Sequence, residues 1–375
     1  MNLSSNEREM KRELQILKTT SGLHSPSVSE IEYNLNLKIE IDACFLCNPY
    51  SQELGYKWLD KDVKKQLQYY PPSNSFLAKY IGNWRNLDPS RIIVGNGAIE
   101  LIYSLINIIK NKKVVIPIPS FSTYYELFEK ENHLIYYQLY PENEYKIELN
   151  DFVQFIEEEK PDYIILINPS NPSGKMLDVG ELKTIHEKLN IHQTLVIDES
   201  FIDFSDIDAS IEHYAANYEN IVIIRSLSKD FGLPGLRLGY SFLPHSIKDQ
   251  LTNSSYPWSI NGLAAAFCSY LNDQEFIEKY DECRINYIHD KKVFYKQLQT
   301  LPVKVYNSSA NFFLIKPDVC AEDLFIRLLN KYGIYTRLLN DKIGLDKNYL
   351  RIASKTKIEN QKIVNALQAE LSYND

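Results

Sequence analysis

The sequence predicts an α/β protein in which a mostly parallel sheet carries helices on both faces. Apolar runs rich in β-branched residues, the mark of buried strands, occur at residues 163–167, 194–197 and 221–224. Helical stretches separate these runs. Strands that alternate with helices are typical of parallel sheets built by right-handed crossovers.

The pattern changes after about residue 250, where a long charged helix and isolated strands indicate a smaller α+β domain. A chain of 375 residues is long enough for one large domain and a smaller one. We therefore expect residues 1–45 to pack with the small domain, residues 46–250 to form the large domain, and residues 251–375 to form the small C-terminal domain.

Composition excludes several classes of partner. Hydrophobic residues make up 44% of the chain and the net charge is -8, without a run of basic residues, so we expect no nucleic-acid partner. The charged N-terminus lacks the apolar core of a secretory signal, and no apolar run approaches the roughly 20 residues of a membrane span.

The odd number of scattered cysteines indicates reduced thiols and a cytoplasmic location. Cys44 and Cys47 form a C-x-x-C pair without further ligands, so packing is favoured and no metal site is expected.

The first part of the chain reads as a charged helix at 5–18 and a short strand at 42–46 that ends before Asn48-Pro49. The segment 69–72, Tyr-Tyr-Pro-Pro, is expected outside a regular helix because proline disfavours helical backbone in the residue before it. An amphipathic helix is expected at 75–84.

A possible anion site follows the strand at 91–94, where a Gly-x-Gly turn leads into a helix. The free backbone N–H groups of Gly97, Ala98 and Ile99 at such a helix start can bind a phosphate. The alternative is a tight strand-to-helix turn in which the glycines serve only steric needs.

Three further strands end in polar or aromatic residues. The strand at 114–116 leads to Phe121, which could stack on a flat ring or simply join the core. The strand at 163–167 leads to a fixed, proline-rich loop at 168–174. The strand at 194–197 ends at Asp198, whose carboxylate is costly to bury unless a cation, such as a protonated pyridine nitrogen, pairs with it. A solvated acid is the alternative.

The stretch 221–240 contains the largest group of candidate catalytic and binding residues. After its strand, glycines and a proline turn the backbone and display Lys229, with Ser226, Ser228 and Arg237 nearby. A neutral lysine can bond covalently to an aldehyde, and hydroxyls with a guanidinium can hold a phosphate. An aldehyde and a phosphate together describe pyridoxal phosphate. A surface lysine beside a glycine-rich turn is the alternative reading.

The C-terminal part reads as a helix at 273–300, a strand at 310–316, a helix at 323–329 and a strand at 349–353. These alternating elements complete the predicted smaller domain.

Four motifs occur in a fixed order: Asn171 in NPSNPSG, Asp198 in DES, Lys229 in SLSK and Arg237 in GLRLGY. On these motifs the chain resembles, over nearly its full length, the fold-type I pyridoxal-phosphate enzymes of the aspartate-aminotransferase superfamily. The resemblance implies pyridoxal 5'-phosphate as the cofactor and an aspartate-aminotransferase-like fold.

The resemblance also implies roles for individual residues. Lys229 would carry the covalent link to the cofactor and later move a proton, Asp198 would hold the pyridinium N–H, and Asn171 would bind the phenolic oxygen of the ring. The remaining implied contacts are Ser226, Ser228, Arg237, Gly97, Ala98 and Ile99 on the cofactor phosphate, Phe121 on the ring, Tyr70 on the phosphate of the partner subunit, and Arg351 on the substrate α-carboxylate.

The branch within this superfamily is indicated by Phe201, three residues after Asp198. Histidinol-phosphate aminotransferases usually carry tyrosine there, whereas threonine-phosphate decarboxylases of cobalamin synthesis carry phenylalanine. Three more stretches resemble those decarboxylases: PWSINGLAAA from Pro257, SANFFLIK from Ser309 and RLLNDKIGLDKNYLRIA from Arg337.

The N-terminal segment resembles the same decarboxylases in the spacing from His24 to the Asn48-Pro49 turn, which makes His24 and Asn48 candidate substrate residues. The sequence His24-Ser25-Pro26 departs from the His-Gly-Gly of that group, so His24 is either a phosphate ligand or a surface histidine. Arg337 matches the group's second arginine and suggests a substrate with a phosphate or second anion; a surface ion pair is the alternative.

Our first hypothesis is decarboxylation of a small O-phospho-amino acid, O-phosphoserine or O-phosphothreonine, to a phospho-aminoalcohol such as ethanolamine phosphate. The alternative is an aminotransferase that uses glutamate and a small phosphorylated carbonyl compound, or histidinol phosphate. A non-catalytic protein on this fold is disfavoured because Lys229 and Asp198 are both present. The resemblance further implies a homodimer with shared active sites.

Overall fold

The computed structural model describes residues 3–20, 25–61, 63–130, 132–205, 209–254 and 256–372. A seven-stranded sheet forms the core of the larger part, in the order β2-β8-β7-β6-β5-β3-β4. Its strands are β2 Ile92–Gly95, β3 Lys113–Ile118, β4 His133–Gln138, β5 Tyr163–Ile167, β6 Thr194–Asp198, β7 Ile221–Ser226 and β8 Gly239–Phe242. Only the pairs that involve β8 are antiparallel among these strands, so the predicted mostly parallel sheet is confirmed.

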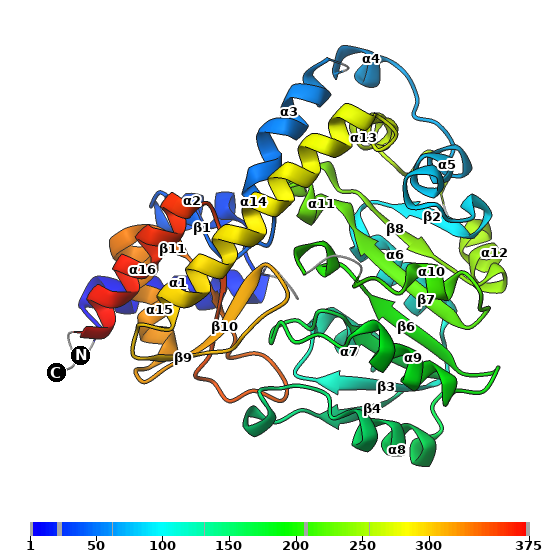
Figure 1. Cartoon of the computed structure of the whole chain (residues 1–375). Helices are drawn as coiled ribbons and strands as arrows, with labels where there is room; N and C mark the ends of the chain where they lie inside the picture. Colours follow the sequence, from blue (N-terminus) through cyan, green and yellow to red (C-terminus); the bar gives the residue numbers. More distant parts are fainter. Residues whose placement is uncertain are drawn as a thin grey trace.

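Helices cover both faces of this sheet, as predicted (Figure 1). Successive side chains of a strand point to opposite faces. In β7, Ile221 and Ile223 pack into one apolar cluster, and Val222 and Ile224 pack into another. The first cluster includes side chains of α5 Asn74–Arg85, α8 Leu149–Glu159, α9 Val179–Glu187 and α13 Gly262–Tyr270; the second includes side chains of α6 Gly97–Ile108, α7 Ser122–Phe128 and α12 His245–Ser254.

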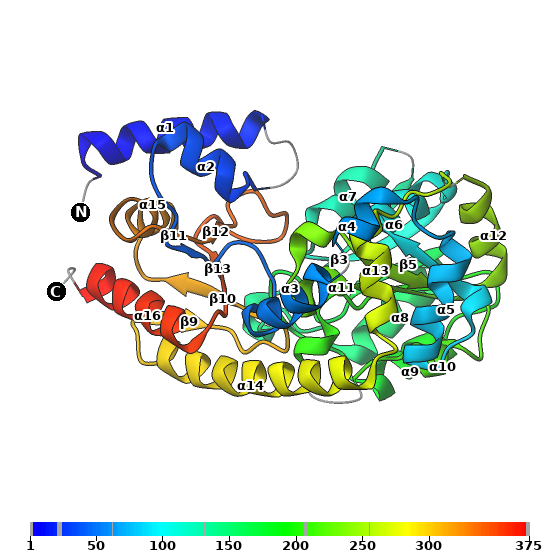
Figure 2. The same cartoon turned by 90° about the horizontal axis from the view of Figure 1, so that it is seen from above.

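The smaller part contains a four-stranded antiparallel sheet in the order β12-β13-β10-β9. Its strands are β9 Val303–Val305, β10 Phe312–Pro317, β12 Arg337–Leu338 and β13 Leu350–Ala353, and its helices are α15 Ala321–Tyr332 and α16 Lys357–Leu371. The N-terminal elements join it, since β1 Ile41–Asp42 pairs with β11 Ile334–Tyr335. In Figure 2, α1 Ser5–Thr20 lies over α15, and α2 Val28–Leu35 lies beside α1.

Helix α14, Gln274–Leu298, runs along both parts of the molecule (Figure 2). Near its start, Phe276 and Tyr280 pack in the apolar cluster of the large sheet. Near its end, Phe294 and Leu298 pack in the cluster of the small part. The predicted boundary at residue 250 therefore stays a prediction, and this packing favours a boundary inside α14.

Two local predictions were wrong. Of the strand expected at 42–46 only Asp42 is extended, in the two-residue strand Ile41–Asp42. The Asp42 carboxylate accepts hydrogen bonds from the backbone N–H groups of Cys44 and Phe45 and so bends the chain after it. The stretch after β7 was expected to form only turns, but Leu227–Asp230 form the one-turn helix α11 and the strand β8 begins at Gly239.

The short remaining elements connect these layers. They are α3 Gln52–Asp60, α4 Val63–Gln68, α10 Glu212–Ala215, η1 Pro49–Ser51, η2 Pro89–Arg91, η3 Pro141–Asn143, η4 Ile202–Phe204 and η5 Pro234–Leu236. Within the described ranges, no helix has both the length and the apolar character needed to cross a membrane.

Candidate active site

A cavity of about 350 Å³ is lined by residues of both parts of the molecule. The large part contributes the ends of β6 and β7, and the small part contributes β12 and β13. A volume of this size is in the range of small-ligand sites. Eleven of the residues predicted for the site line this cavity: Ala98, Ile99, Phe121, Asn171, Asp198, Ser226, Ser228, Lys229, Arg237, Arg337 and Arg351.

Lys229 lies in α11, directly after β7, and is half-buried in the cavity wall. Its Nζ lies 3.8 Å from the centroid of the Phe201 ring. Burial lowers the pKa of Lys229 to about 8; Asp198 opposes this shift, and Arg351 and Arg237 add to it. A lysine with a lowered pKa offers a larger fraction of neutral, nucleophilic amine.

The backbone around Lys229 is fixed by contacts that require a glycine. The carbonyl of Lys229 accepts hydrogen bonds from the N–H groups of Asn48, at 2.7 Å, and Gly232, at 3.2 Å. Gly232 has a φ of +71°, and a Cβ atom built on it would lie 2.2 Å from the carbonyl oxygen of Asn48. Only glycine therefore allows this approach of the two chain segments.

Asp198 ends β6 and is 3% exposed. Its Oδ2 accepts a hydrogen bond from the hydroxyl of Tyr124 at 3.0 Å, and its Oδ1 accepts one from the N–H of Ser200 at 2.9 Å. Burial, together with the Asp198 charge, raises the pKa of Tyr124 well above its usual value. The two donors fix the orientation of the carboxylate, whose remaining lone pairs can accept a further hydrogen bond from a cationic N–H group.

Helix α6 begins at Gly97, and Ala98 and Ile99 in its first turn line the cavity. The φ of Gly97 is +73°, and a Cβ atom built there would lie 2.4 Å from Nη2 of Arg237. The absence of a side chain at Gly97 thus lets the Arg237 guanidinium approach the free N–H groups of the helix start. The charge of the Arg237 guanidinium and the positive end of the α6 dipole together favour an anion at this position.

The two serines of the predicted phosphate site differ. Ser226 is buried at the end of β7 and lines the cavity. The hydroxyl of Ser228 donates to the carbonyl of Leu238 at 3.0 Å and accepts from the N–H of Leu238 at 2.7 Å. In this arrangement Ser228 stabilises the turn between β7 and β8, and its proton is used there.

Arg351 joins the two parts of the molecule. Its Nη1 donates to Oδ1 of Asn171 at 3.0 Å, and its Nη2 donates to the carbonyl of Cys44 at 2.8 Å. The Nε atom is buried and has no hydrogen-bond partner within the described ranges. Burial lowers the pKa of Arg351 to about 10. An unsatisfied buried guanidinium N–H is costly, and an anionic ligand would satisfy it.

Arg337 lies opposite Arg351 in the register of β12 and β13. Its Nη2 pairs with the Asp341 carboxylate at 2.6 Å, and its Nη1 donates to the carbonyl of Leu338 at 2.9 Å. Lys342, in the loop between these strands, also lines the cavity, and burial lowers its pKa to about 7. Three cationic side chains of the small part therefore share one cavity.

Four predicted residues lie elsewhere or outside the described ranges. Gly97 is not itself in the cavity lining. The ring of Tyr70 is 84% exposed and its centroid lies 5.4 Å from that of Trp258. The Asn48 side chain caps η1, where it accepts from the N–H of Tyr50 and donates to Ser51. His24 lies outside the described residues.

Sequence reasoning did not select Tyr124, Ser200 or Lys342 for the site. Tyr124 lies in the first turn of α7, which Phe121 caps, and its place three residues after Phe121 could have indicated that both lie near the same strand ends. Ser200, in the DES motif, follows the selected aspartate by two residues. Lys342 lies inside the stretch from Arg337 that resembles the decarboxylases, but only Arg337 and Arg351 were selected from it.

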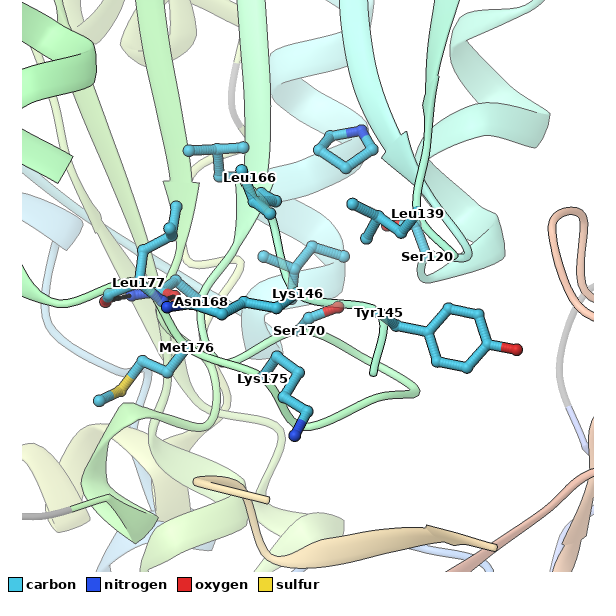
Figure 3. A pocket seen from close by; sticks show the side chains of 13 residues that line it. Ser120, Leu139, Tyr145, Lys146, Leu166, Asn168, Ser170, Lys175, Met176 and Leu177 are labelled. Carbon is cyan, nitrogen blue, oxygen red and sulfur yellow. Dashed lines mark hydrogen bonds between the residues drawn. The ribbon is translucent and has the colours of Figure 1, made fainter. Parts of the chain in front are cut away.

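The residues present fit pyridoxal phosphate. Lys229 offers an amine of lowered pKa, Asp198 a buried carboxylate, and Gly97 with Arg237 an anion cradle. A second cavity, near Leu166, Asn168 and Lys175, holds only about 30 Å³, which is room for one or two waters (Figure 3). The residues that fit the cofactor, among them Lys229, Asp198 and Arg237, line the cavity of about 350 Å³.

Comparison with known proteins gives the same identification. Residues 64–369 match the family described as aminotransferase class I and II. L-Serine phosphate decarboxylase of Campylobacter jejuni is 35% identical over 97% of each chain. The solved structure of a decarboxylase from Sulfurospirillum multivorans is 35% identical, with a TM-score of 0.92 over 99% of this chain and 98% of that one. A histidinol-phosphate aminotransferase of Clostridium novyi is 29% identical over 89% of this chain and 92% of its own length. The protein therefore belongs to the aminotransferase class I and II family, and its cofactor is pyridoxal 5'-phosphate.

Proposed function

We propose that the protein decarboxylates a small O-phospho-L-amino acid, with O-phosphoserine as the first candidate and O-phosphothreonine as the second. The product from O-phosphoserine would be ethanolamine phosphate. The observation that carries the proposal is the cross-strand pair Arg337 and Arg351 in the cavity that contains Lys229. Two guanidinium groups match a substrate with two anionic groups, a carboxylate and a phosphate.

The relatives support the same substrate class. The proteins from Campylobacter jejuni and Sulfurospirillum multivorans cover nearly the full length of this chain, and both are named as decarboxylases. The name of the first specifies L-serine phosphate. We transfer that substrate class to this chain as part of the proposal.

Bound pyridoxal phosphate supplies an electron-poor ring that accepts the electron pair released when a bond at the substrate Cα breaks. Asp198 would hold the ring N–H, and the hydrogen bonds from Tyr124 and Ser200 fix the orientation of the carboxylate for this contact. Arg237 and the N–H groups of Ala98 and Ile99 would hold the cofactor phosphate.

Arg351 would bind the substrate carboxylate and fix its position relative to Asn171, which Arg351 contacts directly. After loss of CO2, the substrate Cα needs a proton. Lys229, with a pKa of about 8, is partly protonated at neutral pH and can donate it. Phe201 places an aromatic ring without a hydroxyl at Lys229, so no phenol from this position competes for the amine.

The alternative function is transamination with glutamate and a phosphorylated carbonyl compound or histidinol phosphate. It is favoured by the similarity to the Clostridium novyi histidinol-phosphate aminotransferase. Both reactions use the same lysine, aspartate and arginines, and they differ in which bond at Cα breaks.

Product analysis of the holoenzyme with O-phospho-L-serine separates the two functions. We expect CO2 and ethanolamine phosphate in equal amounts, and no dependence on added 2-oxoglutarate. Absence of CO2, together with 2-oxoglutarate-dependent formation of glutamate, would establish the aminotransferase instead.

We further propose a homodimer in the cytoplasm, with Tyr70 of each subunit reaching the cofactor phosphate of the other. Two short segments expose aromatic rings, one with Tyr69 and Tyr70 and the other with Tyr256 and Trp258. The rings of Tyr70 and Trp258 lie against each other, and a second copy of the chain would cover this apolar surface. The five cysteines are free, which is compatible with a reducing compartment. Light scattering tests the dimer, and a monomer with full activity would contradict it.

A further inference from the structure

The loop that carries Lys342 is fixed against the large part of the molecule. Gly344 has a φ of +85°, and a Cβ atom built on it would lie 3.0 Å from the backbone N of Pro119, at the end of β3. The carbonyl of Gly344 also accepts a long hydrogen bond of 3.5 Å from the Gln138 side chain. Lys342 is therefore two residues from a close contact between the two parts, which places it in the cavity wall rather than on a free loop.

The charges around Lys342 are not balanced by the protein. Asp341 pairs with Arg337 and, at 3.3 Å, with Lys18. Arg351 donates only to neutral oxygen atoms, those of Asn171 and Cys44.

Among the described residues, Lys342 has no carboxylate within ion-pair distance. The carboxylates of Asp341 and Glu126 attract its ammonium group from farther away. Three cations of the cavity stand against one closely paired carboxylate, Asp341, and the more distant Glu126, which leaves this end of the cavity positive. A site with surplus buried positive charge is prepared for an anionic ligand.

A phospho-amino acid brings two anionic groups, and the phosphate carries up to two charges at neutral pH. If Arg351 binds the carboxylate, Arg337 remains for the phosphate, but Asp341 already neutralises part of its charge. The phosphate therefore needs a further cation. Lys342 is the other cationic side chain of the small part that lines the cavity.

We propose that Lys342 binds the phosphate of the substrate and makes the enzyme select phosphorylated over unphosphorylated amino acids. This inference rests on the proposed function and adds a residue that sequence motifs did not identify. Its pKa of about 7 means that Lys342 is partly neutral before the ligand binds, since burial, Arg337 and Arg351 all disfavour its charge. A bound dianion favours the ammonium form, so ligand binding takes up a proton.

Calorimetric titration of the holoenzyme with ethanolamine phosphate and with ethanolamine, which decarboxylation does not consume, tests this role. In Lys342→Gln, we expect the dissociation constant of ethanolamine phosphate to rise by roughly 10- to 100-fold, while that of ethanolamine changes by less than about threefold. Lys342→Arg should retain most of the affinity because it keeps the charge. Lys347→Gln, an exposed lysine in the same loop that does not line the cavity, is the matched control and should bind as the wild type does.

The proton uptake supplies a readout that a structural role would not change. Titrations in two buffers of different ionisation enthalpy should show uptake at pH 7.5 in the wild type and a smaller uptake in Lys342→Gln. Equal loss of affinity for ethanolamine and ethanolamine phosphate, or unchanged affinity for both, would overturn the inference. If Lys342→Gln does not fold, Lys342→Met is titrated with the same ligands and the same criteria.

The outcomes also separate this inference from the proposed function. CO2 release from O-phospho-L-serine with unchanged selectivity in Lys342→Gln would refute only the role of Lys342. Selectivity that depends on Lys342, without CO2 release by the wild type, would refute only the decarboxylase.

Discussion

Arg337 and Arg351 are direct partners across the antiparallel strands β12 and β13, and both line the cavity that contains Lys229. Like charges at directly opposite positions destabilise a sheet. The protein offsets this repulsion only in part, through the Asp341 carboxylate on Arg337. The pair is thus explained by ligand binding rather than by stability, and Lys342 adds a third charge to the same region.

The first prediction is that Lys342→Gln stabilises the apo-protein at low pH. The folded-state pKa of about 7 lies below the unfolded value of about 10.5, so below pH 7 the folded state carries the full cost of a charged, poorly solvated lysine. This cost decreases as the pH rises from 7 towards 10.5. We expect a gain in unfolding free energy on the order of 1–2 kcal/mol at pH 6, after allowance for solvent screening, and a smaller gain at pH 9.5.

Urea denaturation of the apo-protein, in buffers without phosphate or sulfate, measures this difference. Lys347→Gln serves again as the control. A gain that is equal at both pH values, or larger at pH 9.5, would contradict the assigned pKa shift.

The second prediction concerns Tyr124, whose hydroxyl donates to Asp198. Tyr124→Phe removes one of the two hydrogen bonds that the protein gives to this carboxylate. We expect cofactor affinity to fall by about tenfold, which corresponds to about 1.4 kcal/mol and is typical of a hydrogen bond to a charged group. Cofactor titration followed by absorbance measures the effect.

Tyr125→Phe is the matched control for this change, since the adjacent hydroxyl makes no hydrogen bond with Asp198. An equal loss of cofactor affinity in both variants would show that the Tyr124 hydroxyl has no special role.

Much of the fold could be predicted because apolar β-branched runs mark the central strands, and the carboxyl ends of parallel strands meet at one edge of a sheet. The same rule brings Asn171, Asp198 and Lys229 to one cavity. The short β1 could not be predicted from its apolar residues, because the Asp42 side chain competes for the backbone N–H groups of the next residues. Lys342 could not be found because its position depends on the contact of its loop with β3, and no local pattern records that contact.

The third prediction concerns reaction choice at Phe201, which lies 3.8 Å from the Lys229 amine and is 3% exposed. Phe201→Tyr adds a hydroxyl near the amine that would move a proton at Cα. We expect CO2 release to slow by about tenfold and the share of transamination to rise, because a phenol can hold and orient the neutral amine.

The measurement is the ratio of CO2 to glutamate formed from O-phospho-L-serine with 2-oxoglutarate present. Phe201→Leu, which adds no hydroxyl, separates the effect of the phenol from a change in packing against Phe312. If Phe201→Tyr and Phe201→Leu give the same ratio of CO2 to glutamate, the added hydroxyl is not the cause of the change in reaction.

The fourth prediction concerns the ion cluster behind the site. Arg225, fully buried in β7 immediately before Ser226, pairs with Glu199 at 3.1 Å, Glu212 at 3.4 Å and Asp203 at 2.5 Å. Arg225→Met leaves these carboxylates without their shared cation. We expect a loss of about 3–5 kcal/mol of unfolding free energy, as for other broken buried ion pairs.

Chemical denaturation measures the loss, and Lys279→Gln, which breaks an exposed pair with Glu275, should leave stability unchanged. A loss in Arg225→Met below about 1 kcal/mol would mean that Arg225 is not required to balance the buried carboxylates.

The central claim is that Lys229, rather than the other cavity amine of lowered pKa, Lys342, binds the cofactor. Lys229 is the amine attracted by Asp198 and packed against Phe201, which fits the cofactor contacts assigned above. Borohydride reduction of the holoenzyme, followed by peptide mapping, identifies the bonded lysine directly. We expect one modified residue per chain, Lys229; a label on Lys342, or no label at all, would show that Lys229 does not bind the cofactor.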